Sequence, residues 1–336
     1  MKVCIFGAGA VGGVIAGGLA RSGHEVCVVA RGAHLAAIRE QGLRIRSGTT
    51  GEVSVTRPRA EGDPAKLGPQ DYVIVTVKGP SLPGVAASIA PLLGSQTSIV
   101  TAMNGVPWWF FDRLPFARQD GGNGGTPRLE SLDPHGTLAR AMPTERIVGC
   151  VIHLAASVAE PGLISHNMGA RLILGEPGGR NTERTQGIAA ALESAGFEAV
   201  VTSAIEKEFW VKLLGNVSFN PVSALTLATA DRMIADEHVK AYMVAIMREC
   251  LEIGRAVGVD AEIDPEARID MARQLGRFKT SMLQDLEAGK ALEIDCMLAG
   301  TLEVARKAQV PAPFTESLLG MIRLRAEATG QYARCG

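Results

Sequence analysis

The chain has 336 residues, of which 46% are hydrophobic and 21% are charged, and its formal net charge is −1. This length favours about two domains with a large core, and the balanced charge argues against a nucleic-acid partner. Its six cysteines form neither a CxxC pair nor a Cys/His cluster, so we expect buried thiols in a cytosolic protein rather than a metal site or disulfides.

The first thirty residues predict a dinucleotide-binding unit. A β-type run at 3–6 leads into GAGAVG at 7–12, a helix-like run at 14–23 and a second β run at 25–30. The many glycines disfavour a signal peptide or a membrane span. In this context the GxGxxG pattern is typical of a phosphate-binding turn, although a turn without a ligand is the alternative. The residues expected to contact the cofactor are Gly7, Ala8, Gly9, Ala10, Val11 and Gly12.

The end of the second β run indicates which dinucleotide is bound. An NAD site usually carries an acid there, which binds the ribose hydroxyls. This chain has Arg31 instead, and a cation can pair with a 2′-phosphate. We therefore expect NADPH/NADP+, with a solvated loop arginine as the alternative.

Apolar runs at 72–78 and 98–105 predict parallel strands that are buried on both faces. Lys78 and Asn104 then stand at the carboxyl ends of these strands, where open α/β sheets bind ligands. A surface lysine and an ordinary Asn-Gly turn are the alternatives. A small hairpin is expected at 43–55, between the dinucleotide-binding unit and the first of these strands.

The segment after Asn104 is long and unusual. Residues 107–116 hold five aromatic side chains, and GGNGG follows at 121–125 within a polar stretch that reaches residue 143. The aromatic side chains either anchor the segment to the core or line a pocket beside Asn104. Strands at 146–156, 163–167 and 171–176, a helix at 181–195 and a strand at 197–201 are expected to complete the domain.

From about residue 203 the pattern is helical, with helices expected at 204–228, 232–257, 264–287, 289–308 and 313–329. The predicted fold is therefore α/β, with a Rossmann-type dinucleotide-binding domain at 1–203. An all-helical domain at 204–336 is expected to supply the substrate side of the site.

The stretch WVKLLGNVSFNP at 210–221 places polar residues in an apolar helix. Lys212, Asn216 and Asn220 recur every four residues and form one stripe, because a helix turns by about 100° per residue. A lysine that pairs with Glu208 is one interpretation. It leaves the carboxamides unexplained, since buried carboxamides need hydrogen-bond partners. A polar ligand would provide them.

The stretch TSMLQDLEAGKALEID at 280–295 is open to two interpretations. Ser281 with Gln284 fits a capping box, which is a purely structural role. Glu293 stands at an apolar helix start, where it is either a surface acid or a functional one.

These motifs, taken together and in order, resemble the ketopantoate reductases (2-dehydropantoate 2-reductases) over nearly the whole chain. The resemblance implies a Rossmann-type domain and a helical domain similar to those of 6-phosphogluconate dehydrogenase-like enzymes. It also implies the NADPH-dependent reduction of 2-dehydropantoate to (R)-pantoate, a step of pantothenate synthesis, without a metal.

Matched motif by motif, the resemblance implies that Lys212 and Glu293 are catalytic. It implies substrate contacts for Asn104, Asn216, Asn220 and Ser281, and cofactor contacts for Arg31, Lys78 and Asn104. Many members have Asn-Gly where this chain has Leu298 and Ala299, and segment 107–143 is longer than usual. Both departures bear on the substrate pocket.

Two alternatives stay open at this point: a reductase of another branched 2-oxo acid, and an NADPH-binding regulatory protein without turnover. In either case we expect a cytoplasmic protein with a small-molecule partner and no membrane contact. The oligomeric state is left open, and a homodimer is one option.

Overall fold

The computed structural model describes residues 1–116, 128–180, 182–274 and 276–332. Contacts divide the chain into two compact units. The first is Met1–Met103 with Gly136–Ile205, and the second is Asn104–His135 with Glu206–Gly336. The units therefore do not follow a single break near residue 203, because the segment after Asn104 groups with the helices. The GGNGG stretch at 121–125 lies outside the described residues.

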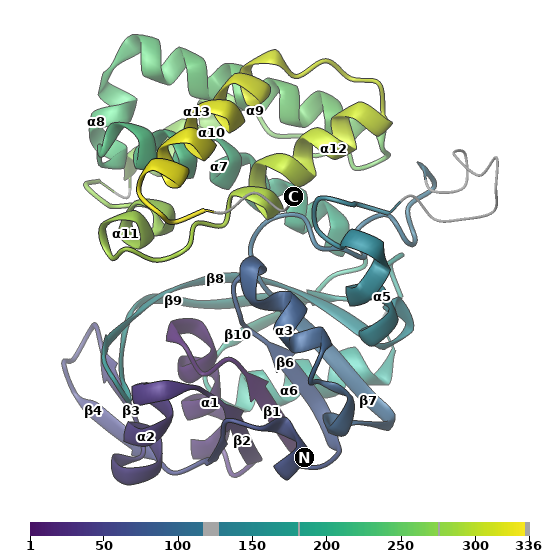
Figure 1. The fold of residues 1–336 in the computed structure, drawn as a ribbon, viewed down its shortest axis with the longest axis vertical. Coiled ribbons are helices and arrows are strands. Elements are labelled where there is room, and N and C mark those ends of the chain that lie inside the picture. The colour runs from purple at the N-terminus through teal and green to yellow at the C-terminus, as the bar shows by residue number, and fades with distance from the viewer. Residues whose placement is uncertain (117–127, 181, 275, 333–336) are drawn as a thin grey trace. The chain divides into compact units, whose positions relative to one another are not determined.

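The first unit is built on one mixed sheet (Figure 1). Its strands are β1 (Lys2–Phe6), β2 (Glu25–Val29), β3 (Leu43–Ser47), β4 (Val53–Thr56), β5 (Arg59–Glu61), β6 (Gln70–Val75), β7 (Leu93–Ala102), β8 (Ile147–Glu160), β9 (Leu163–Gly175) and β10 (Glu198–Val201). The order is β4-β3-β9-β8-β7-β6-β1-β2-β5, and β10 pairs with β9. The predicted α/β class is confirmed.

The parallel part of the sheet runs β8-β7-β6-β1-β2-β5. After β1 the chain first builds β2 on one side and later β6 on the other. The carboxyl ends of β1 and β6 therefore flank the point at which the strand order reverses, and such points bind ligands in α/β sheets. β8 and β9 are antiparallel, as expected, but the two strands expected at 163–167 and 171–176 form one strand, Leu163–Gly175.

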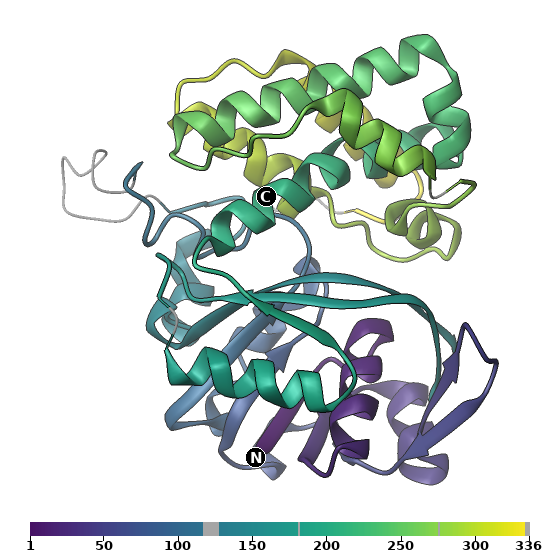
Figure 2. The ribbon, with the colours of Figure 1, turned by 180° about the vertical axis from the view of Figure 1, so that it is seen from behind.

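The glycine-rich helix α1 (Ala10–Arg21) packs against strands of both halves of the sheet. A Cβ on Gly13 would lie 1.9 Å from Ile164 Cδ1, and one on Gly17 would lie 2.9 Å from Ile45 Cγ1. Glycines that are unfavourable in an isolated helix thus let α1 lie directly on the strands. The other α-helices of this unit are α2 (Gly32–Gln41), α3 (Leu82–Ala86), α5 (Thr137–Ala141) and α6 (Glu183–Ser194). In Figure 2, which is seen from behind, α6 lies in front of the strands.

The second unit is helical and is built around α9, which contacts α8, α10, α12 and α13. Its α-helices are α7 (Ile205–Thr226), α8 (Ala230–Ala235), α9 (Glu237–Ala256), α10 (Pro265–Gln274), α11 (Ser281–Glu287), α12 (Gly300–Lys307) and α13 (Pro313–Ala328). One turn of π-helix, η6 (Asp295–Ala299), immediately precedes α12.

Three of the five helices expected in this unit are shorter or divided in the structure. Asp236 divides 232–257, because its carboxylate accepts hydrogen bonds from His238 N and Val239 N and so starts α9. The side chain of Thr280 likewise starts α11 within 264–287. Residues 288–293 are not helical, and Gly289 there has a φ of 65°.

The aromatic segment belongs to the core of the second unit. Phe110 and Phe111 are buried within the cluster of apolar side chains that fills it. The Phe110 ring stacks on Trp210 with centroids 5.3 Å apart, and Trp109 meets Phe209 edge-on at 5.5 Å. Of the two interpretations of this segment, the structure supports the one in which its aromatic side chains anchor it to the core.

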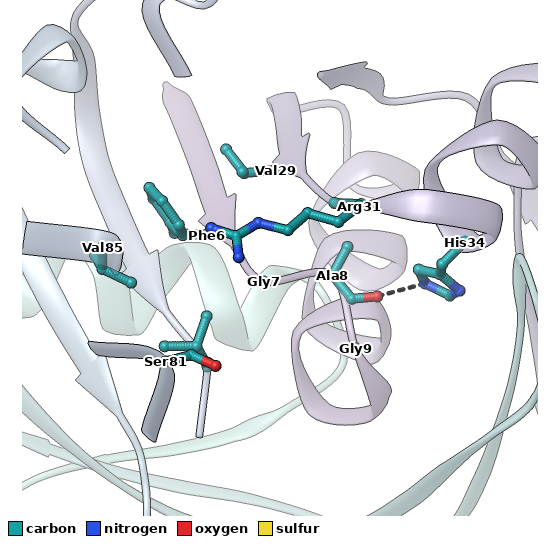
Figure 3. A pocket seen from close by; sticks show the side chains of 11 residues that line it. Phe6, Gly7, Ala8, Gly9, Val29, Arg31, His34, Ser81 and Val85 are labelled. Atoms are coloured by element: carbon teal, nitrogen blue, oxygen red, sulfur yellow. Dashed lines mark hydrogen bonds between the residues drawn. The ribbon is translucent and has the colours of Figure 1, made fainter. Parts of the chain in front are cut away.

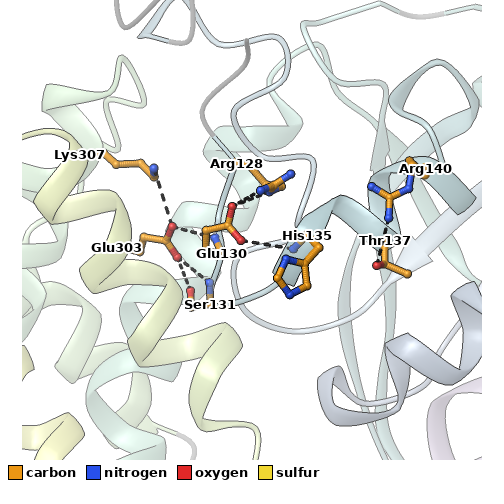
Figure 4. Close-up of polar contacts among 8 residues, drawn as sticks. All are labelled: Arg128, Glu130, Ser131, His135, Thr137, Arg140, Glu303 and Lys307. Atoms are coloured by element: carbon orange, nitrogen blue, oxygen red, sulfur yellow. Dashed lines mark hydrogen bonds and ion pairs between the residues drawn. The ribbon is translucent and has the colours of Figure 1, made fainter. Parts of the chain in front are cut away.

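The far end of the segment is anchored by a carboxylate on α12 (Figure 4). Glu303 accepts hydrogen bonds from Glu130 N and Ser131 N, each at 2.8 Å, and from Ser131 Oγ at 2.6 Å. A carboxylate that receives several donors holds them firmly. This contact explains why 104–135 groups with the helices.

Among the described helices, none combines the length and the apolar character that a membrane crossing requires. The described cysteines, Cys4, Cys27, Cys150, Cys250 and Cys296, are buried, as predicted. Cys335 lies outside the described residues.

Removing the Phe110 ring should destabilise the protein strongly. The ring is fully buried, so Phe110→Ala should lower the free energy of unfolding by about 3–5 kcal/mol. Urea unfolding measures this loss. The matched control is Phe314→Ala on α13, where the ring is 47% exposed and a much smaller loss is expected. Equal losses for the two variants would argue against the anchoring role.

Candidate functional site

A cavity of about 190 Å³ lies in the first unit, at the carboxyl ends of β1 and β2 (Figure 3). Its lining comes from the glycine-rich turn, the start of α2 and the residues that follow β6. The residues are Phe6, Gly7, Ala8, Gly9, Val29, Ala30, Arg31, His34, Val77, Ser81 and Val85. The cavity therefore occupies the place where the strand order predicts a ligand.

The glycine-rich turn has the geometry that a phosphate-binding turn requires. Gly7 has a φ of 105°, which suits glycine, and a Cβ on Gly12 would lie 2.3 Å from Gly7 O. Gly9, in contrast, has nothing within 4 Å of its Cβ position, so its backbone is open to a close approach. Ala10, Val11 and Gly12 form the first turn of α1, whose amides have no partner within the helix. The chain thus fits a dinucleotide pyrophosphate here.

Arg31 precedes α2 and reaches across this cavity toward Phe6 (Figure 3). Its Nη2 atom lies 3.5 Å from the Cβ position of Gly84, next to the lining residue Val85. Among the described residues that line the cavity, none is acidic. The lining therefore favours a ligand with negative charge at this end.

His34 is part of this site, and the sequence analysis did not identify it. Gly162 N donates to His34 Nδ1 at 3.0 Å, so the proton of the neutral ring is on Nε2, which donates to Ala8 O at 2.6 Å. The ring thus ties the glycine-rich turn to the β8–β9 connection. Its spacing of three residues from Arg31 on a helix start was the available signal.

Lys78 follows the carboxyl end of β6 by three residues and is exposed. It does not line the cavity described above. Its place at the sheet edge agrees with the predicted position, although the strand ends at Val75, earlier than expected.

The second group of predicted residues lies in the second unit. Lys212 projects from α7, and its Nζ donates to Asn104 Oδ1 at 2.7 Å. Both side chains are half-buried. The structure therefore brings together a lysine and an asparagine that are 108 positions apart in the chain.

The π-turn η6 contacts both the loop that carries Asn104 and the helix that carries Lys212. Val106 N, two residues after Asn104, donates to Cys296 O at 2.8 Å. Asn220 on α7 is 6% exposed, and its Nδ2 contacts Met297 Sδ at 3.6 Å. π-turns occur often at functional sites. The loop after Asn104 and the polar stripe thus meet at the turn that follows Glu293.

Gly105 makes this approach feasible. It has a φ of 81°, and a Cβ there would lie 2.5 Å from Cys296 O. A side chain would therefore push the Asn104 loop away from the π-turn. The Asn-Gly pair forms a turn here, and the same turn also delivers Asn104 to Lys212.

Glu293 is buried, with 7% of its surface exposed, and it stands just before the π-turn. It is therefore not the surface acid that the sequence left open. Burial raises the pKa of the neighbouring Cys296 thiol well above its usual range, and the nearby Glu293 and Asp295 raise it further. The thiol accordingly stays protonated and is not a nucleophile.

Of the two interpretations of Ser281, the structure does not support the capping box with Gln284. Thr280 caps α11 by accepting from Leu283 N at 3.2 Å, and the Gln284 side chain donates to Lys279 O instead. Ser281 is exposed at the first position of the helix. Its hydroxyl is therefore not used by the cap. Asn216 is half-buried in the middle of α7, so its carboxamide caps no helix end.

Comparisons with known proteins place this geometry in context. The family model "Ketopantoate reductase PanE/ApbA" matches residues 3–107, and the model of its C-terminal part matches residues 204–326. A 2-dehydropantoate 2-reductase from Mesorhizobium japonicum is 42% identical over 99% of this chain and 100% of its own length.

Solved structures show the same fold. The crystal structure of a candidate ketopantoate reductase from Ralstonia solanacearum has a TM-score of 0.92 and 47% identity, over 98% of this chain and 99% of that one. D-mandelate dehydrogenase, solved with NADH and anilino(oxo)acetate, has a TM-score of 0.81 over 99% of this chain and 100% of that one. At 17% identity the latter similarity concerns the fold alone.

Proposed function

The chain belongs to the ketopantoate reductase family, and we propose that it reduces 2-dehydropantoate to (R)-pantoate with NADPH, a step of pantothenate biosynthesis. The proposal places the enzyme in the cytoplasm and leaves its oligomeric state open, a homodimer included. The observation that carries it is the cluster of Lys212, Asn104, Asn220 and the π-turn that follows Glu293.

Lys212 acts as the acid in this proposal. NADPH, when bound, supplies the hydride that the ketone carbon accepts. Negative charge then grows on the carbonyl oxygen, and the Lys212 ammonium stabilises this charge and transfers a proton from Nζ to that oxygen. The ketone thereby becomes a secondary alcohol. Asn104 orients the ammonium through its hydrogen bond to Nζ.

The remaining polar residues of the second unit bind and orient the substrate. Asn216, Asn220 and Ser281 hold its carboxylate and hydroxyl groups, which sets the ketone in position for reaction. Glu293 engages the substrate and helps to orient Lys212. Buried polar side chains need partners, and Asn220 has only a weak contact with a sulfur atom among the contacts described.

In the first unit, Gly7 to Gly12 bind the pyrophosphate, and Arg31 binds the 2′-phosphate that distinguishes NADPH from NADH. Lys78 and Asn104 make the further cofactor contacts. The absence of an acid from the described cavity lining supports this preference, because a carboxylate would repel the phosphate.

A second candidate substrate is another branched 2-oxo acid. Leu298 and Ala299 stand where many members of the family carry Asn-Gly, and both lie buried in the π-turn. This change removes polar groups from the turn that contacts Asn220. It therefore favours a site in which part of the substrate is less polar.

Rates of NADPH oxidation with several 2-oxo acids test the proposed reaction. The panel contains 2-dehydropantoate, pyruvate, 2-oxoisovalerate and 2-oxoisocaproate. The highest kcat/KM is expected for 2-dehydropantoate. A higher value for 2-oxoisovalerate or 2-oxoisocaproate would support the second candidate, and binding of NADPH without oxidation by any acid would contradict both.

The cofactor preference depends on Arg31. Arg31→Ala should weaken NADPH binding about 10- to 150-fold, which corresponds to the 1.5–3 kcal/mol of a hydrogen bond to a charged group. NADH binding should change little. Fluorescence titration of both cofactors measures this, with Arg21→Ala at the end of α1 as the control. Equal losses for both cofactors would exclude a contact between Arg31 and the 2′-phosphate.

Lys212→Ala should lower kcat by about 10²- to 10⁴-fold, the usual contribution of a positioned acid. NADPH affinity should hardly change, because the phosphates bind in the first unit. The matched control is Lys207→Ala, which removes an exposed lysine from the first turn of the same helix. Asn216→Ala and Asn220→Ala should mainly raise KM. A folded Lys212 variant with wild-type kcat would show that the polar stripe is structural.

A further inference from the structure

The residues that carry Glu293 are held by the last described residues of the chain. Residues 288–293 have neither helix nor strand. Gln331 Nε2, which is buried, donates to Lys290 O at 2.7 Å, to Asp285 O at 3.1 Å and to Leu286 O at 3.2 Å. Leu292 N in turn donates to Gln331 O at 3.2 Å. Gln331 thus supplies hydrogen-bond partners to backbone groups that are not paired within a helix or a sheet.

A second contact fixes the stretch on the other side of Glu293. Tyr332 OH donates to Asp295 Oδ1 at 2.8 Å, and Arg323 Nη2 donates to the same oxygen at 2.9 Å. The Arg323 guanidinium also lies 5.6 Å from the centre of the Tyr332 ring. Burial raises the pKa of Tyr332 to about 12, and the bond to Asp295 adds to this effect, so the phenol remains a donor at any physiological pH.

Glu293 therefore stands between two anchored neighbours. Leu292, just before it, is bonded to Gln331, and Asp295, two residues after it, is bonded to Tyr332. Gln331 lies three residues after the end of α13, and its backbone N–H donates a hydrogen bond to Ala326 O at 2.8 Å. The fixed end of α13 thus sets the path of the backbone on both sides of the Glu293 carboxylate.

We propose that Gln331 and Tyr332 are positioning residues, which hold Glu293 and the π-turn in the geometry that catalysis requires. The inference rests on the proposed function, since it needs Glu293 to take part in the reaction. The two residues do not touch the substrate; they act through the backbone at Leu292 and through Asp295. Gln331 and Tyr332, which lie far from the polar stripe in sequence, thereby contribute to the activity of the enzyme.

Tyr332→Phe tests this proposal with the smallest change, because it removes one hydroxyl and retains the ring. We expect kcat for the best 2-oxo acid to fall roughly 3- to 10-fold, the equivalent of one hydrogen bond. NADPH affinity should stay the same. Gln331→Ala should have a larger effect, and Tyr332→Phe still tests the proposal where that variant does not fold.

Tyr242→Phe is the matched control. Tyr242 also lies in the second unit and donates one hydrogen bond through its hydroxyl, to Phe314 O at 3.0 Å. It has no described contact with residues 288–299. Its loss should lower the melting temperature about as much as Tyr332→Phe and leave kcat unchanged. Equal effects of the two variants on kcat would overturn the positioning role.

Combination with Glu293→Gln shows whether Tyr332 acts through Glu293. If it does, Tyr332→Phe adds little to the loss already caused by Glu293→Gln, because the group that it positions is no longer functional. Independent, multiplicative losses overturn the inference and leave the proposed reaction intact. A Glu293→Gln variant with wild-type kcat removes Glu293 from the proposed mechanism, and the positioning role is then wrong as well.

Discussion

The hydrogen bond from Val106 N to Cys296 O, at 2.8 Å, is the contact on which the polar cluster of the second unit depends. It holds the loop after β7 against the π-turn, and Asn104 thereby reaches Lys212. The approach is close enough that only glycine fits at position 105. An ammonium group and carboxamides in an apolar helix would otherwise be costly. Here Lys212 is bonded to Asn104, and Asn220 contacts the Met297 sulfur of the π-turn.

The first unit relies on a related constraint, which is the close approach of backbone to backbone. Gly12 and Gly13 let α1 lie against the strands, while Gly9 remains open. Glycine therefore allows close packing at positions 12 and 13 and leaves the backbone accessible to a ligand at position 9. Hydrogen bonds from Thr76 Oγ1 to Gly7 O and from His34 Nε2 to Ala8 O then hold the turn in one conformation. A preformed turn binds phosphate without the cost of ordering the loop.

The long segment after Asn104 affects the site indirectly. Phe110 stacks on Trp210, two residues before Lys212 on α7, and Glu303 holds the end of the segment at Ser131. Both contacts stabilise the elements that carry polar residues, without placing an aromatic ring in the cavity of the first unit. The extra length of this segment therefore stabilises the elements that carry the polar residues. Leu298 and Ala299, inside the π-turn, are the departures for which we propose an effect on the choice of substrate.

The sequence by itself determined the features that depend on local spacing. The order of strand, glycine turn and helix at 3–23, the position of Arg31 and the stripe of Lys212, Asn216 and Asn220 follow from periodicity and motif. Helix α7 was expected at 204–228 and spans Ile205–Thr226. Neighbouring residues suffice for such features, because a helix or a βα turn is defined within a few positions.

Only the tertiary structure decided the features that depend on distant residues. The burial of Glu293, the grouping of 104–135 with the helices, and the roles of His34 and Gln331 arise from contacts between remote segments. The cap at Thr280 rather than Ser281 belongs here too, since either of two adjacent hydroxyls could have capped the helix and the sequence does not choose between them. Sequence spacing cannot rank such choices, because the deciding partner lies tens to hundreds of residues away.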